Sequence, residues 1–371
     1  MNNNDENSKE NKNNKIITNN SKKMKIYYYF FVLRIISSFA IVLIHVSAIY
    51  YYRFKITSND FKISFFYNGL SRFGVPIFFM ISGALFLNRD RSFRIIYIKK
   101  IKRILIRLII WSFIYSISSL QLSKIDIKMI IFKFFSGHYH LWFLLSITGL
   151  YILVPFLREV AKNDGLLKMF ILLSLIFTFL FPNFNIIISF YSKSYFKVFN
   201  NIYSSLNLNY ISGNVFYFMI GYYLNNNNTK FNIYKTLFIY IIGFFGALFS
   251  IKLSYNIVLK YNIKNTYFFF PEYLNIAIYS ISIFIFIKNL FINKMYNQKL
   301  SLIKIISSNT FGIYLVHPLI IEKVNKYKIY KFTLFTRILF RIPMLTSFIY
   351  LSSLLISIMI KYIPLIGKYL L

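Results

Sequence analysis

The chain has 371 residues, of which 57% are hydrophobic, 21% aromatic and only 15% charged. A soluble fold cannot bury so much apolar surface, so the composition indicates a multi-pass membrane protein and excludes soluble multidomain enzymes, disulfide-stapled secreted domains and disordered chains. Because the chain has no cysteine, disulfides and cysteine-ligated metal sites are excluded as well. Lys and Arg outnumber Asp and Glu by 44 to 10. These cations fall mostly between apolar runs, where they contact lipid headgroups, so we expect no nucleic-acid partner.

The N-terminal stretch 1–25 differs in composition from everything that follows. It contains nine Asn, six Lys and three acidic residues, with almost no apolar side chains. Such a segment cannot build a hydrophobic core, so we expect a disordered cytoplasmic tail. The apolar run after it is too long for a signal peptide and lacks a small-residue cleavage site. The rest of the chain, 26–371, is predicted to form one membrane domain.

Long apolar runs fill that domain and predict its fold class. Because a membrane span needs about 20 residues, we expect an all-α, polytopic integral membrane bundle of about ten transmembrane helices. The predicted spans are 27–50, 72–88, 104–122, 141–157, 166–182, 210–224, 234–256, 267–287, 303–321 and 342–363. The second and sixth are short enough to be tilted or re-entrant. The stretch 183–199 is apolar enough to lie in the membrane interface or to change the number of spans that is counted.

The positions of the cations predict the orientation. Loop 88–103 carries seven basic residues and one Asp, and the loop with Lys288 and Lys304 is also basic. Basic loops stay in the cytoplasm, so both termini are expected on the cytoplasmic side of the cell membrane. One loop disagrees, because 322–341 is rich in Lys and Arg yet falls on the outer side.

The first predicted span contains two ionisable residues, Arg34 and His45, which are expensive in hydrocarbon and therefore candidates for function. Eleven residues of α-helix make close to three turns, so both side chains share one face, about 16 Å apart along the axis. An Arg suits a phosphate or carboxylate, and a buried neutral His suits a general base. The alternative is an interfacial arginine and a histidine that hydrogen-bonds a neighbouring helix.

Five motifs follow one another along the chain. The first is Arg34 and His45, with ten residues between them. The others are GVPIFFMISGALFL (74–87), YIKKIKRILIR (97–107), HLWFLLSITGLYILVPFL (140–157) and SNTFGIYLVHPLII (308–321). In this order and spacing they resemble the motifs of acyltransferase family 3, membrane enzymes that acylate cell-surface glycans and lipids. The overall pattern is most similar to the stand-alone O-acetyltransferase branch.

This resemblance implies a donor, an acceptor and a donor site. The donor would be cytoplasmic acetyl-CoA or another acyl-CoA, used as a co-substrate and not as a permanently bound cofactor. The acceptor would be a hydroxyl of a cell-surface polysaccharide, peptidoglycan or a lipid-linked glycan. Arg34, Lys100 and Arg103 are the candidates for holding the CoA phosphates, with Lys100 standing where the family has Arg. If their stretch is helical, Lys100 and Arg103 are neighbours at a spacing of three.

The chemistry of such a transfer also needs groups that act at the acyl carbon. His45 is the predicted general base on the acceptor hydroxyl, or a transient acyl carrier that relays the group across the bilayer. His140 and His317 match family motifs and are further catalytic candidates. Ser82, Asn309 and Tyr314 are candidates for supporting the oxyanion. Either Glu272 or Glu322 would be able to orient a histidine as a triad carboxylate does, and the alternative is that both are plain interfacial residues.

Each of these assignments has a structural alternative. His140 can be an interfacial residue beside Trp142, and His317 can satisfy the carbonyl freed by Pro318. Ser82 belongs to a Ser-Gly pair that would permit close helix packing. A metal site is not expected, since His138 and His140 have no acidic or cysteine ligand beside them in the sequence.

Two other classes of protein share the multi-pass architecture. One is a transporter or flippase of a lipid-linked glycan, and the other is a non-catalytic integral protein whose polar residues only assemble helices. A transporter is expected to contain repeated halves with matching broken helices. No internal repeat is visible, and Arg34 and His45 have no counterpart in the second half. The ordered motifs argue against the non-catalytic protein, so the membrane acyltransferase is the favoured interpretation.

Overall fold

The computed structural model describes residues 28–88, 92, 94–118, 126–208, 211–227, 231–264, 269–291, 301–327, 337–364 and 366–371. Helices occupy most of these residues, and no strand occurs among them. The predicted all-α membrane bundle is therefore confirmed. The predicted tail, 1–25, lies outside the described residues.

Helical elements follow one another along the whole described chain. In chain order they are α2 (Tyr28–Arg53), α3 (Asn59–Leu70), α4 (Gly74–Phe86), the π-helical η1 (Ile95–Ile101), α5 (Lys102–Ser118), α6 (Ile127–Ser136), α7 (Trp142–Lys162), α8 (Asp164–Leu175), the π-helical η2 (Ile176–Leu180), α9 (Phe181–Tyr191), α10 (Lys193–Ser205), α11 (Asn214–Asn226), α12 (Ile233–Tyr261), α13 (Leu274–Phe291), α14 (Ser301–Lys326), α15 (Ile338–Tyr362) and α16 (Ile366–Leu370).

Seven helical segments of the described chain are long and apolar enough to cross a membrane. They are Tyr28–Arg53, Asn59–Phe86, Trp142–Lys162, Asp164–Asn185, Ile233–Tyr261, Leu274–Phe291 and Ile338–Tyr362. The predicted spans 104–122, 210–224 and 303–321 correspond to α5, α11 and α14, which fall outside these seven. Two of them are short, with 17 residues in α5 and 13 in α11. The count of ten spans therefore stays a prediction.

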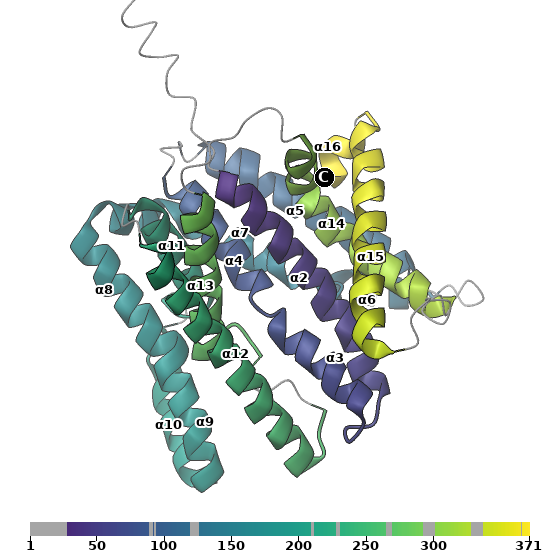
Figure 1. The fold of residues 1–371 in the computed structure, drawn as a ribbon. Helices are drawn as coiled ribbons and strands as arrows, with labels where there is room; N and C mark the ends of the chain where they lie inside the picture. Colours follow the sequence, from purple (N-terminus) through teal and green to yellow (C-terminus); the bar gives the residue numbers. More distant parts are fainter. Residues whose placement is uncertain are drawn as a thin grey trace, which may run out of the picture.

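Helix α2 lies at the centre of the bundle. It packs against α3, α4, α13, α14 and α15, and it crosses the middle of the molecule in Figure 1. The start of α2 and the C-terminus lie at the same end of the bundle (Figure 1). The short C-terminal helix α16 is tied to α5 at this end, where Nε1 of Trp111 donates to the carbonyl of Leu370 at 3.1 Å. A central α2 places the first sequence motif among the helices that carry the others.

The second membrane segment is a broken helix. The predicted span 72–88 is only its second half, because α3 precedes it and the chain turns at 71–73 before α4 begins. Gly74 opens α4 where the segment meets α2, and a Cβ on Gly74 would lie 2.9 Å from the carbonyl oxygen of Ser37. The sequence pattern missed α3 because this helix carries Asp60 and Lys62 near its start, which lowers the hydropathy of the run.

Helices α4 and α11 approach each other backbone to backbone. A Cβ on Gly83 would lie 1.8 Å from the carbonyl oxygen of Phe218, and one on Gly221 would lie 2.1 Å from that of Met80. Only glycine leaves room for such contacts, as is common where membrane helices pack closely. The packing interpretation of the Ser-Gly pair thus holds for Gly83.

The stretch 183–199 belongs to two helices that run side by side. It covers most of α9 and the first half of α10, which are joined at Ser192 and pack on each other, as Figure 1 shows. On α10, the exposed side chains Tyr195, Val198 and Ile202 recur at helical spacing and form one apolar face. Such a face fits the interfacial position that the sequence leaves open.

Candidate active site

The four histidines of the chain converge in one cluster, which we call the histidine cluster: His45, His138, His140 and His317. The ring centroids of His45 and His317 are 5.2 Å apart, and those of His140 and His317 are 5.8 Å apart. The ring centroid of His138 lies 4.9 Å from that of His140. The sequence offered three of these rings as separate candidates, and the fold brings them together with the fourth.

Three different parts of the fold supply these rings. His45 lies on α2, and His317 lies on α14 directly before Pro318. His138 and His140 lie in the short connection between α6 and α7, which Gly137 opens with a φ of +68°. A side chain would strain that conformation, so glycine lets the chain leave α6 and turn the histidines inward. His140 and His317 are buried, whereas His45 and His138 are partly exposed.

A hydrogen-bonded chain links two of the histidines to a carboxylate. Oε1 of Glu322 lies 3.0 Å from Nε2 of His138, and Nδ1 of His138 lies 2.7 Å from Nδ1 of His140. Glu322 is thus the acid that meets a histidine, one of the two possibilities seen in the sequence. Glu272 lies exposed between α12 and α13, and no contact with a histidine is found for it in the described part of the chain.

Neither buried histidine has a partner at Nε2 among the described residues. For His317, Nδ1 bonds the carbonyl oxygen of Ile313 at 3.0 Å, and the ring also interacts with the carbonyl of Tyr314, which Pro318 deprives of its amide donor. A carbonyl only accepts, so Nδ1 carries the proton and Nε2 keeps its lone pair. His317 therefore fills the structural role expected of it and still presents a basic nitrogen.

Aromatic side chains wall the histidine cluster. Tyr115 stacks on His138 with centroids 4.1 Å apart, and the ring centroid of Tyr139 lies 5.0 Å from that of His45. The hydroxyl of Tyr314 donates to the carbonyl oxygen of His140. That bond uses the hydroxyl proton of Tyr314 to hold the connection before α7, and a role of Tyr314 at the oxyanion stays a prediction.

The environment of His140 favours its neutral ring. Burial lowers the pKa of His140 below its ordinary value, and the neighbouring rings of His317, His138 and His45 lower it further. A neutral imidazole keeps one lone pair, which is what a general base needs. In the described residues, no three His, Cys, Asp or Glu side chains are placed to hold a metal ion.

The other two support candidates, Asn309 and Ser82, lie on α14 and α4. Asn309 is buried on α14, about 12 Å along the helix from His317. Its Nδ2 donates to the carbonyl oxygen of Ile305 at 2.7 Å, and its Oδ1 accepts from Oγ of Ser357 at 3.3 Å, so it joins α14 to α15. Ser82 is partly buried on α4 beside Gly83, and its hydroxyl makes no hydrogen bond within the described residues.

The three candidate cations do not form one continuous helical patch. Arg34 is partly buried on α2, Lys100 belongs to η1 and Arg103 to α5. The spacing of three between Lys100 and Arg103 therefore crosses from a π-helix into an α-helix, so the rule for neighbours on a regular α-helix does not apply to them. The sequence pattern gave no sign of this change in helix type.

Arg103 lines a small basic notch, which we define by Lys99, Lys102, Arg103 and Lys368. Its volume is about 160 Å³, and Ile98, Ile106 and Tyr369 complete the lining. Lys368 comes from α16, so residues far apart in the sequence share this notch. Cations grouped in this way are suited to the phosphates of a nucleotide. Lys100 does not line it.

Sequence reasoning missed a polar link beside His45. Nδ2 of Asn68 donates to the carbonyl oxygen of Ile44 at 2.9 Å and to Oγ of Ser47 at 3.1 Å. Oδ1 of Asn68 accepts from Nε of Arg72 at 3.0 Å, which holds that guanidinium at the break between α3 and α4. Asn68 and Arg72, two polar residues four apart in an apolar stretch, were the signal that could have revealed this link. The predicted span begins only at residue 72 and therefore leaves Asn68 out.

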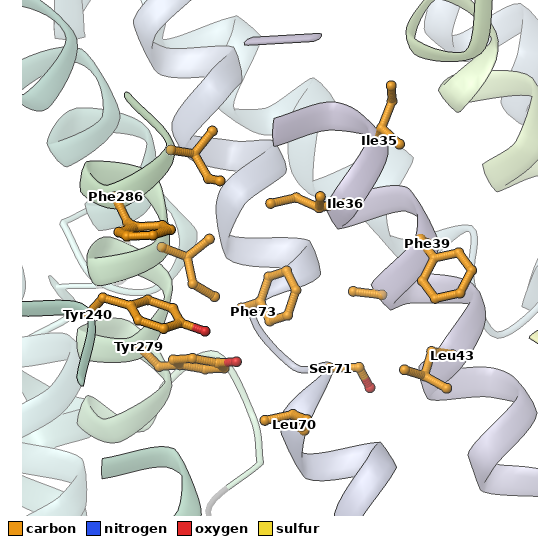
Figure 2. A pocket seen from close by; sticks show the side chains of 13 residues that line it. Ile35, Ile36, Phe39, Leu43, Leu70, Ser71, Phe73, Tyr240, Tyr279 and Phe286 are labelled. Carbon is orange, nitrogen blue, oxygen red and sulfur yellow. The ribbon is translucent and has the colours of Figure 1, made fainter. Parts of the chain in front are cut away.

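The structure also contains an apolar groove between α2 and the pair α12 and α13. Figure 2 shows Phe73, Tyr240, Tyr279 and Phe286 around this groove of about 460 Å³. The lining residues on α2 are Ile35, Ile36, Phe39, Ala40 and Leu43. This α2 lining falls roughly 100–240° around the helix from Arg34, whereas His45 falls within about 20° of Arg34. The groove therefore lies on the opposite face of α2 from the histidine cluster.

Comparison with known proteins returns one family. The model of the acyltransferase domain of acyltransferase family 3 matches residues 27–362, which is nearly the whole chain. No curated protein and no solved structure gives a significant match. The matched range contains the histidine cluster, Glu322 and the three candidate cations, whereas Lys368 of the basic notch lies outside it. The chain belongs to acyltransferase family 3 and is a membrane acyltransferase.

Proposed function

We propose that this membrane acyltransferase moves an acetyl group from cytoplasmic acetyl-CoA to a hydroxyl of a cell-surface polysaccharide, peptidoglycan or a lipid-linked glycan. The observation that carries the proposal is the histidine cluster, in which His45 of the first motif lies against His317 of the last. Imidazole activates a hydroxyl, or carries an acyl group, near neutral pH. The family supplies the reaction class, and the cluster supplies the groups that such a reaction needs.

The chemistry assigned to His45 has two forms. In direct transfer, His45 removes the proton of the acceptor hydroxyl while its oxygen attacks the thioester carbonyl. In the relay, His45 itself attacks the thioester, releases CoA and then passes the acyl group to the acceptor. The partly exposed position of His45 beside Tyr139 supports both forms, since a substrate must reach the reacting ring.

The donor is assigned to the end of α2 that carries Arg34. The highly charged nucleotide end of CoA would bind cations there, with Arg34 and Arg103 as the main anchors and Lys100 beside them. The basic notch around Arg103 supports this assignment, because four cations share one space of about 160 Å³. The pantetheine arm then extends along α2 towards His45, about 16 Å away along the helix axis.

The test uses purified protein in liposomes with radiolabelled acetyl-CoA and extracted cell-envelope glycolipids. We expect CoA release and transfer of label to a glycan in the wild type. His45→Ala should abolish both while the protein remains folded, and Arg34→Ala should raise the donor KM. Arg53→Ala is the matched control, since Arg53 lies at the opposite end of the same helix and contacts Asn325.

Two outcomes would contradict the proposal. If the wild type neither binds nor consumes acetyl-CoA with acceptor present, the acetyl donor is wrong, and other acyl-CoAs are tested next. If a labelled glycolipid crosses the bilayer without release of CoA, the protein acts as a flippase. Equal effects of Arg34→Ala and Arg53→Ala on the donor KM would refute the assigned donor site but not the acyl transfer.

A further inference from the structure

We propose that Glu322 and His138 are positioning residues that hold the proton of His140 on Nδ1, so that Nε2 of His140 acts as the base for the acceptor hydroxyl. This inference rests on the proposed function. It replaces His45 by His140 as the base of direct transfer and leaves the relay form, in which His45 carries the acyl group, unchanged. It follows from the hydrogen-bonded chain in which Glu322, His138 and His140 are joined at 3.0 and 2.7 Å.

The proton positions follow from donor and acceptor rules. A carboxylate only accepts, so the hydrogen bond to Glu322 requires the proton of neutral His138 on Nε2. Nδ1 of His138 then has a lone pair and must accept. The 2.7 Å contact therefore requires the proton of His140 on Nδ1. Nε2 of His140 keeps its lone pair, and it is buried without a partner among the described residues.

The same chain stabilises the charge that proton transfer creates. When Nε2 of His140 takes a proton, the proton on its Nδ1 can pass to Nδ1 of His138. The positive charge then lies on His138, in direct contact with Glu322. An opposite charge at this distance favours the charged ring. Glu322 thus strengthens the base without touching it, as the aspartate of a catalytic triad does for its histidine.

The proton balance of the transfer closes within the site. The acceptor O–H gives its proton to Nε2 of His140, and the oxygen forms a bond to the thioester carbon. The tetrahedral intermediate then collapses with cleavage of the C–S bond. The leaving CoA thiolate takes the proton from His140, so the products are the ester and CoA, with His140 neutral again.

Several titratable groups face His140. They are His45 on α2, Tyr115 on α5, Tyr139 in the same connection, and Tyr314 and His317 on α14. The hydroxyl of Tyr115 donates to the carbonyl oxygen of Leu315 at 2.7 Å, and that of Tyr314 donates to the backbone carbonyl oxygen of His140. Neither hydroxyl is available as the base. Within the described residues, His140 is the only one of the four histidines whose ring is linked to a carboxylate through a second ring.

The first arm of the test reads the protons directly, without any substrate. The full chain is labelled with 15N-histidine, reconstituted in liposomes and measured by solid-state NMR, which separates protonated from unprotonated ring nitrogens. Only four rings contribute, and His138→Phe and His140→Phe assign two of them. We expect the proton on Nε2 of His138 and on Nδ1 of His140. A proton on Nε2 of His140 in the wild type would overturn the proposal.

The second arm removes the carboxylate. In Glu322→Met the ring protons of His138 and His140 should redistribute, and kcat should fall about 10- to 100-fold with the donor KM unchanged. Loss of the charge lowers the pKa of the base, so the acid limb of the pH–rate profile should move down by about 0.5–1 unit. His138→Phe keeps the stack on Tyr115 and should reduce kcat similarly.

The matched control is Glu272→Met, which removes an exposed carboxylate outside the histidine cluster. It should leave the NMR spectrum, kcat and the pH profile as in the wild type. If Glu322→Met behaves like this control, the positioning role is refuted. If the predicted ring protons are found but no acyl-CoA is consumed, the proposed function fails while the geometry of the chain stands.

Discussion

The backbone contact between α4 and α11 makes a sharp prediction about Gly83. In Gly83→Ala the new Cβ would lie 1.8 Å from the carbonyl oxygen of Phe218, whereas ordinary contact begins near 3.4 Å. The two helices would have to separate by 1.6 Å, the difference between these values. Overpacking of a well-packed interior costs about 1–3 kcal/mol. Because the obstacle is backbone, we expect about 3 kcal/mol, or roughly a 100-fold change in the unfolding equilibrium.

The assay for Gly83→Ala is thermal unfolding in detergent, with folded protein measured by size-exclusion chromatography. Gly149→Ala on α7 and Gly246→Ala on α12 are matched controls, because a Cβ at either position meets no atom within 4 Å. These controls should be as stable as the wild type or gain up to about 1 kcal/mol from better helix propensity. Equal midpoints for Gly83→Ala and the two controls would refute the close approach of α4 and α11.

Three further predictions concern other contacts. Lys288→Met removes the ammonium that donates to three carbonyl oxygens at the end of α11, at 2.5, 2.8 and 3.3 Å. The protein should lose about 1–3 kcal/mol of stability, and its thermal unfolding midpoint should fall. An unchanged midpoint would contradict this. Tyr314→Phe removes the bond to the carbonyl of His140 and should lower kcat more than it raises the donor KM, as steady-state kinetics would show. Arg103→Ala and Lys368→Ala should each raise the donor KM, less so at high salt, and a salt-independent KM would argue against phosphate binding in the notch.

The fold class and several helix positions could be predicted from the sequence because they depend on local apolar content. The run after Tyr27 became α2, and the run 342–363 became most of α15. The broken segment was harder, since α3 mixes Asp60 and Lys62 into its first turn and hides its membrane position from a hydropathy window. The change to π-helix at Lys100 involves hydrogen bonds that residue spacing does not report.

The candidate site was only partly predictable, for a different reason. Motifs identified His45, His140 and His317 one at a time, but their convergence depends on the packing of α2, α14 and the connection before α7. On a helix, a spacing of two would turn His138 away from His140. The connection is not helical, so the two rings meet at Nδ1. No local pattern shows that Glu322, more than 180 residues further along the chain, completes the contact.

Helix α2 is unbroken from Tyr28 to Arg53, and this continuity has a consequence for donor selection. A hinge between Arg34 and His45 would let the protein adapt to donors of different length. A continuous helix instead keeps Arg34 and His45 at one fixed separation. A donor anchored at Arg34 must carry its reactive carbon across about 16 Å. Small activated acyl compounds such as acetyl phosphate would fail for lack of reach, even though their carbonyl group is reactive enough.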